Sequence, residues 1–146
     1  MKRRKKVSTV DEIMSDHPVT ITSEHSLESA LDLLSKHGIR ELPVVESGRL
    51  IGIVTDRDLR QVAPSYPLFR DEEEIRYYNQ NVKVASAMTP DPLTVSPETP
   101  LVEAAKLLRT HRINSLPVVD HARLVGIVSV TDFLKLFIEQ NGREAS

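Results

Sequence analysis

The sequence has 146 residues, a formal net charge of −2 and an isoelectric point near 6.2. This length suggests one compact domain, and the near-neutral charge argues against a nucleic-acid-binding protein whose whole surface is basic. Hydrophobic residues make up 40% of the chain, which is enough for a core. There is no cysteine, so the fold needs neither disulfides nor thiolate metal sites, as suits a cytoplasmic protein.

The first six residues are basic, with the run Lys2-Arg3-Arg4-Lys5-Lys6. No apolar segment follows them, so they do not form a secretory signal, and no apolar run approaches the ~18–20 residues that span a bilayer. Two interpretations of this segment stay open: a solvated tail, or an electrostatic arm for RNA, DNA or anionic lipid. Because aromatic residues are few and tryptophan is absent, a stacking surface for single-stranded nucleic acid is not expected.

The chain contains a tandem repeat in which residue 14 aligns with residue 88, a shift of 74 positions. The segment Leu-Pro-Val-Val at 42–45 recurs at 116–119, and Gly-Ile-Val at 52–54 recurs at 126–128. The alignment needs no gap between residues 14 and 58. We therefore predict a basic tail at 1–7, one repeat at 8–62, a connector at 63–81, a second repeat at 82–140 and a tail at 141–146.

The predicted elements follow the same order in both repeats. The first repeat has a helical turn at 10–14, a strand at 19–21, a helix N-capped by Ser26 that ends at His37 before Gly38, hairpin strands at 42–45 and 50–55, and a helix at 56–61. Leu27, Ala30, Leu31 and Leu34 have the spacing of one helix face. The second repeat has a strand at 93–95, a helix beginning near Pro100, hairpin strands at 116–119 and 124–129, and a helix at 130–140. Within the connector, we predict a short helix at 72–79. The connector either covers part of a site or partner surface or is a surface excursion.

This β-α-β-β-α order gives each repeat a small sheet whose helices cover only one face. A single repeat of this size buries too little apolar surface to be stable alone. We therefore predict an α+β fold in which the two repeats pack sheet to sheet with pseudo-two-fold symmetry and form two equivalent clefts.

The strongest local motif lies where the last strand of each repeat ends. Thr55 and Asp58 follow Gly52-Ile53-Val54, and Ser129 and Asp132 occupy the matching positions. A hydroxyl and free amides at a helix N-terminus suit a phosphate, and a carboxylate can accept both hydroxyls of a ribose. The alternative is helix capping, with the hydroxyl residue as N-cap and the aspartate at N3. The recurrence in both repeats favours a site, although shared ancestry alone would also preserve it.

These residues carry a family resemblance. The pattern Ile-x-x-Leu-Pro-Val-Val, followed by Gly-Ile-Val-Thr/Ser-x-x-Asp and present twice, resembles a pair of CBS (cystathionine β-synthase) domains, the Bateman module. The long connector and compact format are also similar to proteins of the acetoin-utilisation type. The resemblance implies a regulatory module, not an enzyme, that binds AMP, ADP, ATP or S-adenosylmethionine between the repeats. The alternatives are a dimerisation or scaffold protein with vestigial clefts, or an enzyme acting on the bound nucleotide.

The resemblance also implies a role for individual residues. The aspartates would hold the ribose and the hydroxyl residues the phosphate, at Thr55, Asp58, Ser129, Thr131 and Asp132. Arg57 replaces the second hydroxyl of the first repeat, where it adds charge for a polyphosphate or reaches solvent. The opposite repeat would complete each cleft. The residues expected to face Asp58 are Thr94, Thr99, Ile113, Asn114 and Ser115. The residues expected to face Asp132 are Thr20, His25, Ile39 and Arg40.

The last helix of each repeat carries more apolar residues than the interior of so short a chain can hold. We therefore predict a homodimer, on the basis of Leu59, Phe133, Leu134, Leu136, Phe137 and Ile138. The five histidines lack the spacing of metal ligands, so no metal site is predicted. Asp56 and Asp58 resemble an acid–base pair, but no nucleophile accompanies them, and no catalytic residue, catalytic cofactor or membrane partner is expected. The sequence does not identify a regulated target.

Overall fold

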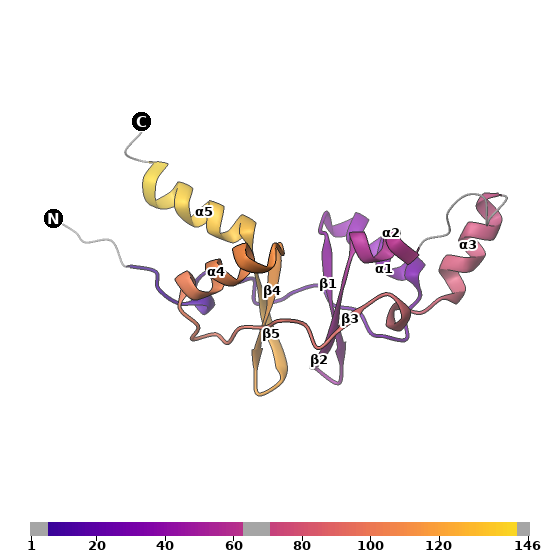
Figure 1. Cartoon of the computed structure of the whole chain (residues 1–146), viewed down its shortest axis with the longest axis horizontal. Helices are drawn as coiled ribbons and strands as arrows, with labels where there is room; N and C mark the ends of the chain where they lie inside the picture. The colour runs from indigo at the N-terminus through magenta and orange to yellow at the C-terminus, as the bar shows by residue number, and fades with distance from the viewer. Residues whose placement is uncertain (1–5, 63–70, 143–146) are drawn as a thin grey trace. The chain divides into compact units, whose positions relative to one another are not determined.

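The structure, a computed structural model, describes residues 6–62 and 71–142. The chain divides into two compact units instead of the one domain that its length suggested. The first-repeat unit is Val19–Pro92, and the second-repeat unit combines Met1–Pro18 with Leu93–Ser146. Each unit contains an antiparallel hairpin accompanied by helices, so the predicted α+β class is confirmed (Figure 1).

The first-repeat unit is built around an antiparallel hairpin in which Glu41 lies opposite Thr55. Ser26 accepts a hydrogen bond from the Ser29 amide at the start of the first helix, and Gly38 closes that helix with φ 60°, as predicted. The elements are α1 (Leu27–His37), β1 (Glu41–Glu46), β2 (Arg49–Thr55), α2 (Asp56–Val62), α3 (Glu72–Asn81), the 3-10 turn η2 (Val84–Ser86) and β3 (Thr89–Pro90).

The second-repeat unit repeats this plan with Ser115 opposite Ser129 in its hairpin. Its first helix ends on Arg112, which adopts the left-handed conformation (φ 53°) that Gly38 provides in the first repeat. The elements are the 3-10 turn η1 (Val10–Glu12), α4 (Leu101–His111), β4 (Ser115–Asp120), β5 (Arg123–Ser129) and α5 (Val130–Asn141). The described residues contain no helix that has both the length and the apolar character needed to cross a bilayer.

Each unit has its own hydrophobic core, in which a helix stripe packs on the central strands. The predicted stripe is narrower than expected, because Leu31 is exposed. The buried positions shared by the two cores are Leu27, Ala30, Leu34, Leu42, Val44 and Val54 in the first, and Leu101, Ala104, Leu108, Leu116, Val118 and Val128 in the second. The Leu-Pro-Val-Val motif therefore recurs because its leucine and first valine are buried in the core of each unit.

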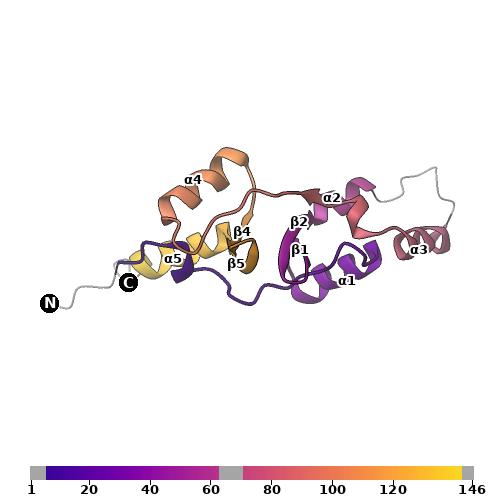
Figure 2. The ribbon, with the colours of Figure 1, turned by 90° about the horizontal axis from the view of Figure 1, so that it is seen from below.

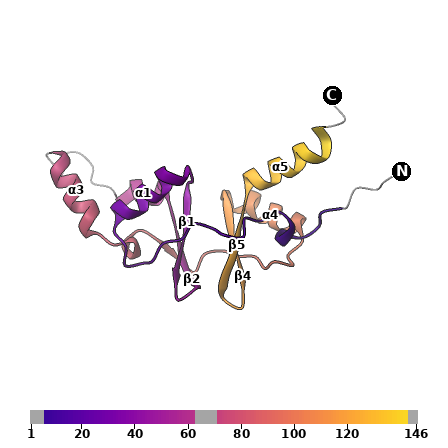
Figure 3. The ribbon, with the colours of Figure 1, turned by 180° about the vertical axis from the view of Figure 1, so that it is seen from behind.

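The segment that begins each sequence repeat packs into the other repeat's core. Val10 is fully buried in the second-repeat unit, and its amide donates to the Thr99 carbonyl over 3.0 Å. In the same way Val84 is buried in the first-repeat unit, where its amide donates to the His25 carbonyl over 2.8 Å. Figure 3 shows the indigo N-terminal segment beside α4, and Figure 2 gives the same unit seen from below. The compact units and the sequence repeats therefore have different boundaries.

The predicted strands at 19–21 and 93–95 are wrong as strands. Each forms a single parallel bridge, Ile21 to Val44 and Val95 to Val118. Pro18 and Pro92 precede these segments and lack an N–H group, and a turn follows each bridge at once, so there is no room for a ladder. The third strand of the first-repeat unit is instead β3, which no sequence pattern indicated and which pairs with β2 at Gly52 and Ile53.

Candidate functional site

The junction between β2 and α2 in the first-repeat unit is closed by two reciprocal hydrogen bonds. The Asp58 amide donates to Thr55 Oγ1 (3.0 Å), and the Thr55 amide donates to Asp58 Oδ2 (2.9 Å). The capping interpretation is therefore confirmed. The cap occupies only one carboxylate oxygen, since Asp58 Oδ1 has no hydrogen-bond partner among the residues that the structure describes. Capping thus uses only one of the two carboxylate oxygens of Asp58.

The junction between β5 and α5 has the same construction. The Ser129 amide donates to Asp132 Oδ2 (2.8 Å), and the Asp132 amide donates to Ser129 Oγ (3.3 Å). Ser129 Oγ also lies 3.1 Å from Asp132 Oδ2. Thr131, within the first turn of α5, is exposed. Both repeats therefore hold an aspartate rigidly at the helix start, with one carboxylate oxygen committed to the cap.

The residues just before each Leu-Pro strand lie beside the cap of their own unit. The carbonyl of Arg40 accepts a hydrogen bond from the Asp56 amide, and the carbonyl of Asn114 accepts one from the Val130 amide, both over 2.9 Å. Arg40 and Asn114 have exposed side chains, whereas Ile39 and Ile113 are half-buried. Each unit thus brings two of its predicted segments together at one end of its hairpin.

Ser115 is the one candidate residue that is buried, with a relative exposure of 5%. Its Oγ has no hydrogen-bond partner in the described part of the chain. Leaving a buried hydroxyl unpaired costs about 1–3 kcal/mol. In the first repeat the equivalent residue is Glu41, so this hydroxyl belongs to the second repeat alone. The resemblance named Ser115, but only the structure reveals that the hydroxyl is buried and unpaired.

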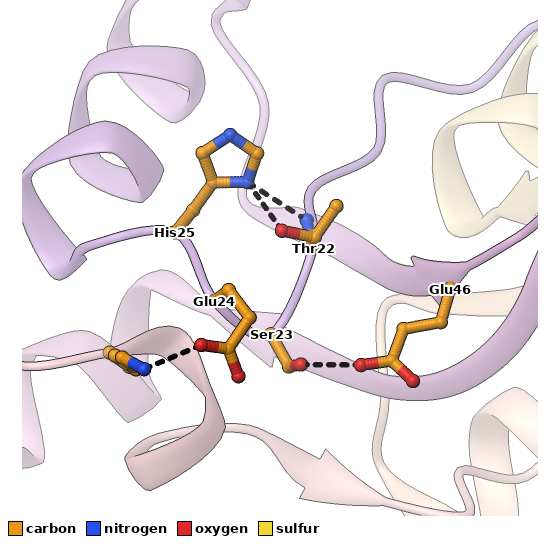
Figure 4. A network of polar contacts seen from close by, with 6 residues as sticks. Thr22, Ser23, Glu24, His25 and Glu46 are labelled. Carbon is orange, nitrogen blue, oxygen red and sulfur yellow. Dashed lines mark hydrogen bonds and ion pairs between the residues drawn. The ribbon is translucent and has the colours of Figure 1, made fainter.

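The turn after the single bridge differs between the units, and Figure 4 shows that of the first-repeat unit. In the first-repeat unit, His25 Nδ1 accepts from the Thr22 amide (3.2 Å) and lies 2.8 Å from Thr22 Oγ1. In the second-repeat unit, Thr99 Oγ1 takes this place and accepts from the Ser96 amide (2.9 Å). His25 and Thr99 are therefore turn-closing residues of their own units.

Sequence reasoning missed a second contact of the first-repeat turn. The Ser23 side chain, also 5% exposed, donates to Glu46 Oε1 over 2.8 Å and ties the turn to the end of β1 (Figure 4). A serine and a glutamate separated by 23 positions give no sequence signal. The contact shows that the first-repeat turn is held from two sides.

Thr20 and Thr94 occupy matching half-buried positions next to the bridge residues Ile21 and Val95. The predicted site residues are therefore divided between the units. The first-repeat unit holds Thr20, His25, Ile39, Arg40, Thr55, Arg57 and Asp58. The second-repeat unit holds Thr94, Thr99, Ile113, Asn114, Ser115, Ser129, Thr131 and Asp132. That residues of one repeat face the aspartate of the other stays a prediction.

The positively charged candidates belong to one unit only. Arg40 and Arg57 are exposed, and neither has an ionic partner among the described residues. Neither Arg nor Lys occurs among the candidates of the second-repeat unit. Arginine side chains for an anionic group such as a phosphate are therefore supplied by the first-repeat unit.

His17, His25 and His121 take part in local contacts. His17 Nδ1 lies 2.9 Å from Asp16 Oδ1, and this hydrogen bond with the neighbouring imidazole lowers the pKa of the Asp16 carboxyl. His121 forms a similar pair with Asp120 over 2.7 Å. Within residues 6–62 and 71–142, no three histidine, aspartate or glutamate side chains are grouped so that they could hold a metal ion.

Comparison with known families identifies both repeats. The family model of the CBS domain matches residues 10–65 and 84–139. A CBS domain-containing protein of Dictyostelium discoideum is 41% identical over 133 residues, which cover 89% of this chain and 91% of that protein. An inosine-5'-monophosphate dehydrogenase of Korarchaeum cryptofilum is 36% identical over 117 residues, but these are only 21% of the enzyme.

Solved structures show the same similarity. A Vibrio cholerae protein assigned to acetoin utilization (AcuB) has a TM-score of 0.77 and 31% identity, with 94% of this chain and 96% of that chain covered. CBSX2 in complex with AMP has a TM-score of 0.76 and 28% identity over 91% and 98% of the two chains. The CBS domain pair of MJ0100, in complex with 5'-methylthioadenosine and S-adenosyl-L-methionine, has a TM-score of 0.73 and 30% identity over 92% and 99%.

Proposed function

Because the chain belongs to the CBS-domain family, we propose that it is a regulatory module that senses an adenosine-containing ligand: AMP, ADP, ATP or S-adenosylmethionine. Similar domain pairs have been solved with AMP and with S-adenosylmethionine. The observation in this chain that carries the proposal is the buried, unpaired Ser115 hydroxyl. A ligand atom that hydrogen-bonds to this hydroxyl would recover part of its desolvation cost, and would thereby gain affinity.

The proposed role of each aspartate follows from the carboxylate oxygen that its helix cap leaves without a hydrogen bond. Oδ1 of Asp58 and of Asp132 accepts the ribose hydroxyls, while Oδ2 keeps the helix start in place. Arg40 and Arg57 bind the phosphate, since their guanidinium groups are exposed and have no ionic partner in the described residues. In line with the resemblance, the opposite repeat completes each site: Arg57 serves the ligand of Asp58 in its own repeat, and Arg40 serves the ligand of Asp132.

Titration calorimetry of the full chain with AMP, ADP, ATP and S-adenosylmethionine tests the proposal. We expect at least one of them to bind, and Asp58→Asn or Asp132→Asn to weaken binding at least tenfold, the loss typical of a charge-assisted hydrogen bond. Asparagine retains an oxygen that can accept the cap hydrogen bond, so these variants should stay folded. Ser23→Ala is the control variant. Its hydroxyl is hydrogen-bonded to Glu46 and is not among the proposed ligand contacts, so the ligand affinity should stay unchanged.

Failure of all four compounds to bind the folded chain would remove the ligand-sensing function. A scaffold protein would then remain, a possibility favoured by the caps, which give Thr55, Asp58, Ser129 and Asp132 a structural role without any ligand. The proposed module has no catalytic activity of its own, so ATP incubated with it should stay intact. Self-association as a homodimer and a cytoplasmic location also belong to the proposal.

A further inference from the structure

Each unit contains a methionine that packs against a glycine in the second strand of its hairpin. A Cβ atom at Gly126 of β5 would lie 2.6 Å from Met14 Sδ. In the first-repeat unit, a Cβ atom at Gly52 of β2 would lie 2.8 Å from Met88 Sδ. Real Cβ atoms are essentially never so close to another atom, so each sulfur fills the space that a side chain on the strand would need. We call these two pairs the methionine–glycine contacts.

Each methionine lies between a turn that enters the core and the backbone pairing that holds this turn to the hairpin. Met14 follows η1, whose Val10 is buried. It precedes Ser15, which exchanges two backbone hydrogen bonds of 2.9 and 3.0 Å with Ile127 of β5. Met88 has the same place between η2 and β3, and β3 pairs with β2. A change at either sulfur therefore acts on both attachments of its turn.

The two sulfur atoms are candidates for oxidation. The chain has three methionines and no cysteine, and Met1 lies outside the described residues. Met14 and Met88 therefore hold all the sulfur of residues 6–62 and 71–142. Both side chains are half-buried, so a small solute such as hydrogen peroxide reaches them from water. The susceptibility of a thioether to oxidation follows its exposure.

The reaction with hydrogen peroxide converts the thioether into a sulfoxide. A lone pair of the sulfur attacks one peroxide oxygen, so that an S–O bond forms and the O–O bond breaks. The sulfur loses two electrons to the peroxide. The departing hydroxide takes up the proton of the transferred oxygen and leaves as water. Methionine sulfoxide reductases reverse the change at the expense of a thiol.

The sulfoxide does not fit the methionine–glycine contact. The new oxygen is added to an atom that already fills the space above the strand backbone. It is also a polar acceptor, whereas the core side chains against which Met14 and Met88 pack are apolar and offer it no donor. The oxygen reaches water only if the turn moves away from the strand. Oxidation therefore opposes the pairing of Ser15 with Ile127 and that of β3 with β2.

From this we propose that Met14 and Met88 are reversible oxidation sites for a peroxide, and that their sulfoxides release η1 and η2 from the hairpins. The second-repeat unit is the more sensitive, because a single bridge holds its segment to β5 while β3 pairs with β2 at two positions. The inference does not depend on the proposed ligand. It gives the chain a response to oxidants that is carried by the fold of each unit.

The two strands concerned lead directly to the candidate site residues. β5 continues from Gly126 to Ser129, the N-cap of α5, and β2 continues from Gly52 to Thr55. Release of η1 or η2 thus removes a neighbour of the strand that positions each capped aspartate.

Peroxide treatment of the full chain, followed by mass spectrometry and hydrogen exchange, tests the proposal. The wild type should form sulfoxide at both positions, and exchange protection of the Ile127 and Val84 amides should fall at least about tenfold. Met14→Leu should prevent the loss at Ile127 only, and Met88→Leu the loss at Val84 only, so each variant is the matched control of the other. Leucine has a similar volume and forms no sulfoxide.

Reduction of the oxidised wild type by both stereospecific methionine sulfoxide reductases with dithiothreitol should restore protection, and this measurement needs no variant. Absence of sulfoxide at both positions, while half of the N-acetylmethionine amide in the same tube is oxidised, would overturn the assignment of these sites. Sulfoxide formation with unchanged exchange would refute the release of the turns. A larger loss at Val84 than at Ile127 would refute the order of sensitivity.

Discussion

Replacing Ser115 by alanine should stabilise the ligand-free protein. The hydroxyl is buried and has no hydrogen-bond partner within the described residues, so the folded state carries its desolvation cost. Ser23 is an internal reference, because it has the same 5% exposure but donates a 2.8 Å hydrogen bond to Glu46. The two serines differ mainly in whether the hydroxyl is satisfied.

The expected magnitudes follow from that difference. Removing an unsatisfied hydroxyl recovers part of its roughly 1–3 kcal/mol penalty, and the small void left by the oxygen subtracts from this, so Ser115→Ala should raise the free energy of unfolding by about 1 kcal/mol. Ser23→Ala should lower it by about 1 kcal/mol, since Glu46 can turn to water. For a chain of this length each change corresponds to about 3 °C in Tm, in opposite directions.

Urea denaturation and differential scanning calorimetry of the two variants, without and with AMP, measure both effects. With AMP at saturation the wild type should gain more stability than Ser115→Ala, since ligand binding stabilises by RT ln(1 + [L]/Kd). A destabilised Ser115→Ala protein would show that the hydroxyl has a partner in the ligand-free state. Equal AMP stabilisation of wild type and Ser115→Ala would show that no ligand atom contacts it, and would remove the central support for ligand sensing.

Three further predictions concern packing and capping. Val10→Ala should lower the free energy of unfolding by about 2 kcal/mol, and hydrogen exchange should show the loss of protection in the second-repeat unit and not in Val19–Pro92. Gly126→Ala should cost about 1–3 kcal/mol in urea denaturation, because the new Cβ would lie 2.6 Å from Met14 Sδ; unchanged stability would contradict this packing. Ser129→Ala should lower Tm by about 3 °C through loss of the α5 N-cap, and an unchanged Tm would show that the cap contributes nothing.

Elements governed by neighbours in sequence were predictable. The helix from Ser26 to Gly38 was predicted with its caps, because N-cap serine and C-terminal glycine act within one turn of the chain. The hairpins were predicted within one or two residues, since alternating β-branched residues flank short turns. The strand at 19–21 was not, because a ladder needs a partner strand of matching length, and a single bridge satisfies this segment.

The polar residues of the candidate site also divide into those governed by sequence neighbours and those governed by distant contacts. The sequence indicated that Thr55 and Asp58 either cap a helix or bind a ligand, and the structure shows the cap with one carboxylate oxygen still free. That Ser23 is satisfied and Ser115 is not could not be read from the residues. Both are serines with the same 5% exposure, and only the distance to a possible partner distinguishes their hydroxyls.

The sequence by itself determined the duplication, the main helices and hairpins of each repeat and the family, because these depend on residue identity, periodicity and short-range capping. Only the tertiary structure decided that Val10 belongs to the core of the second repeat and Val84 to the core of the first. It also decided which apolar residues of α5 are left in water. Those outcomes depend on contacts between residues far apart in the chain, where many apolar partners are chemically equivalent and only the packing of the whole unit selects among them.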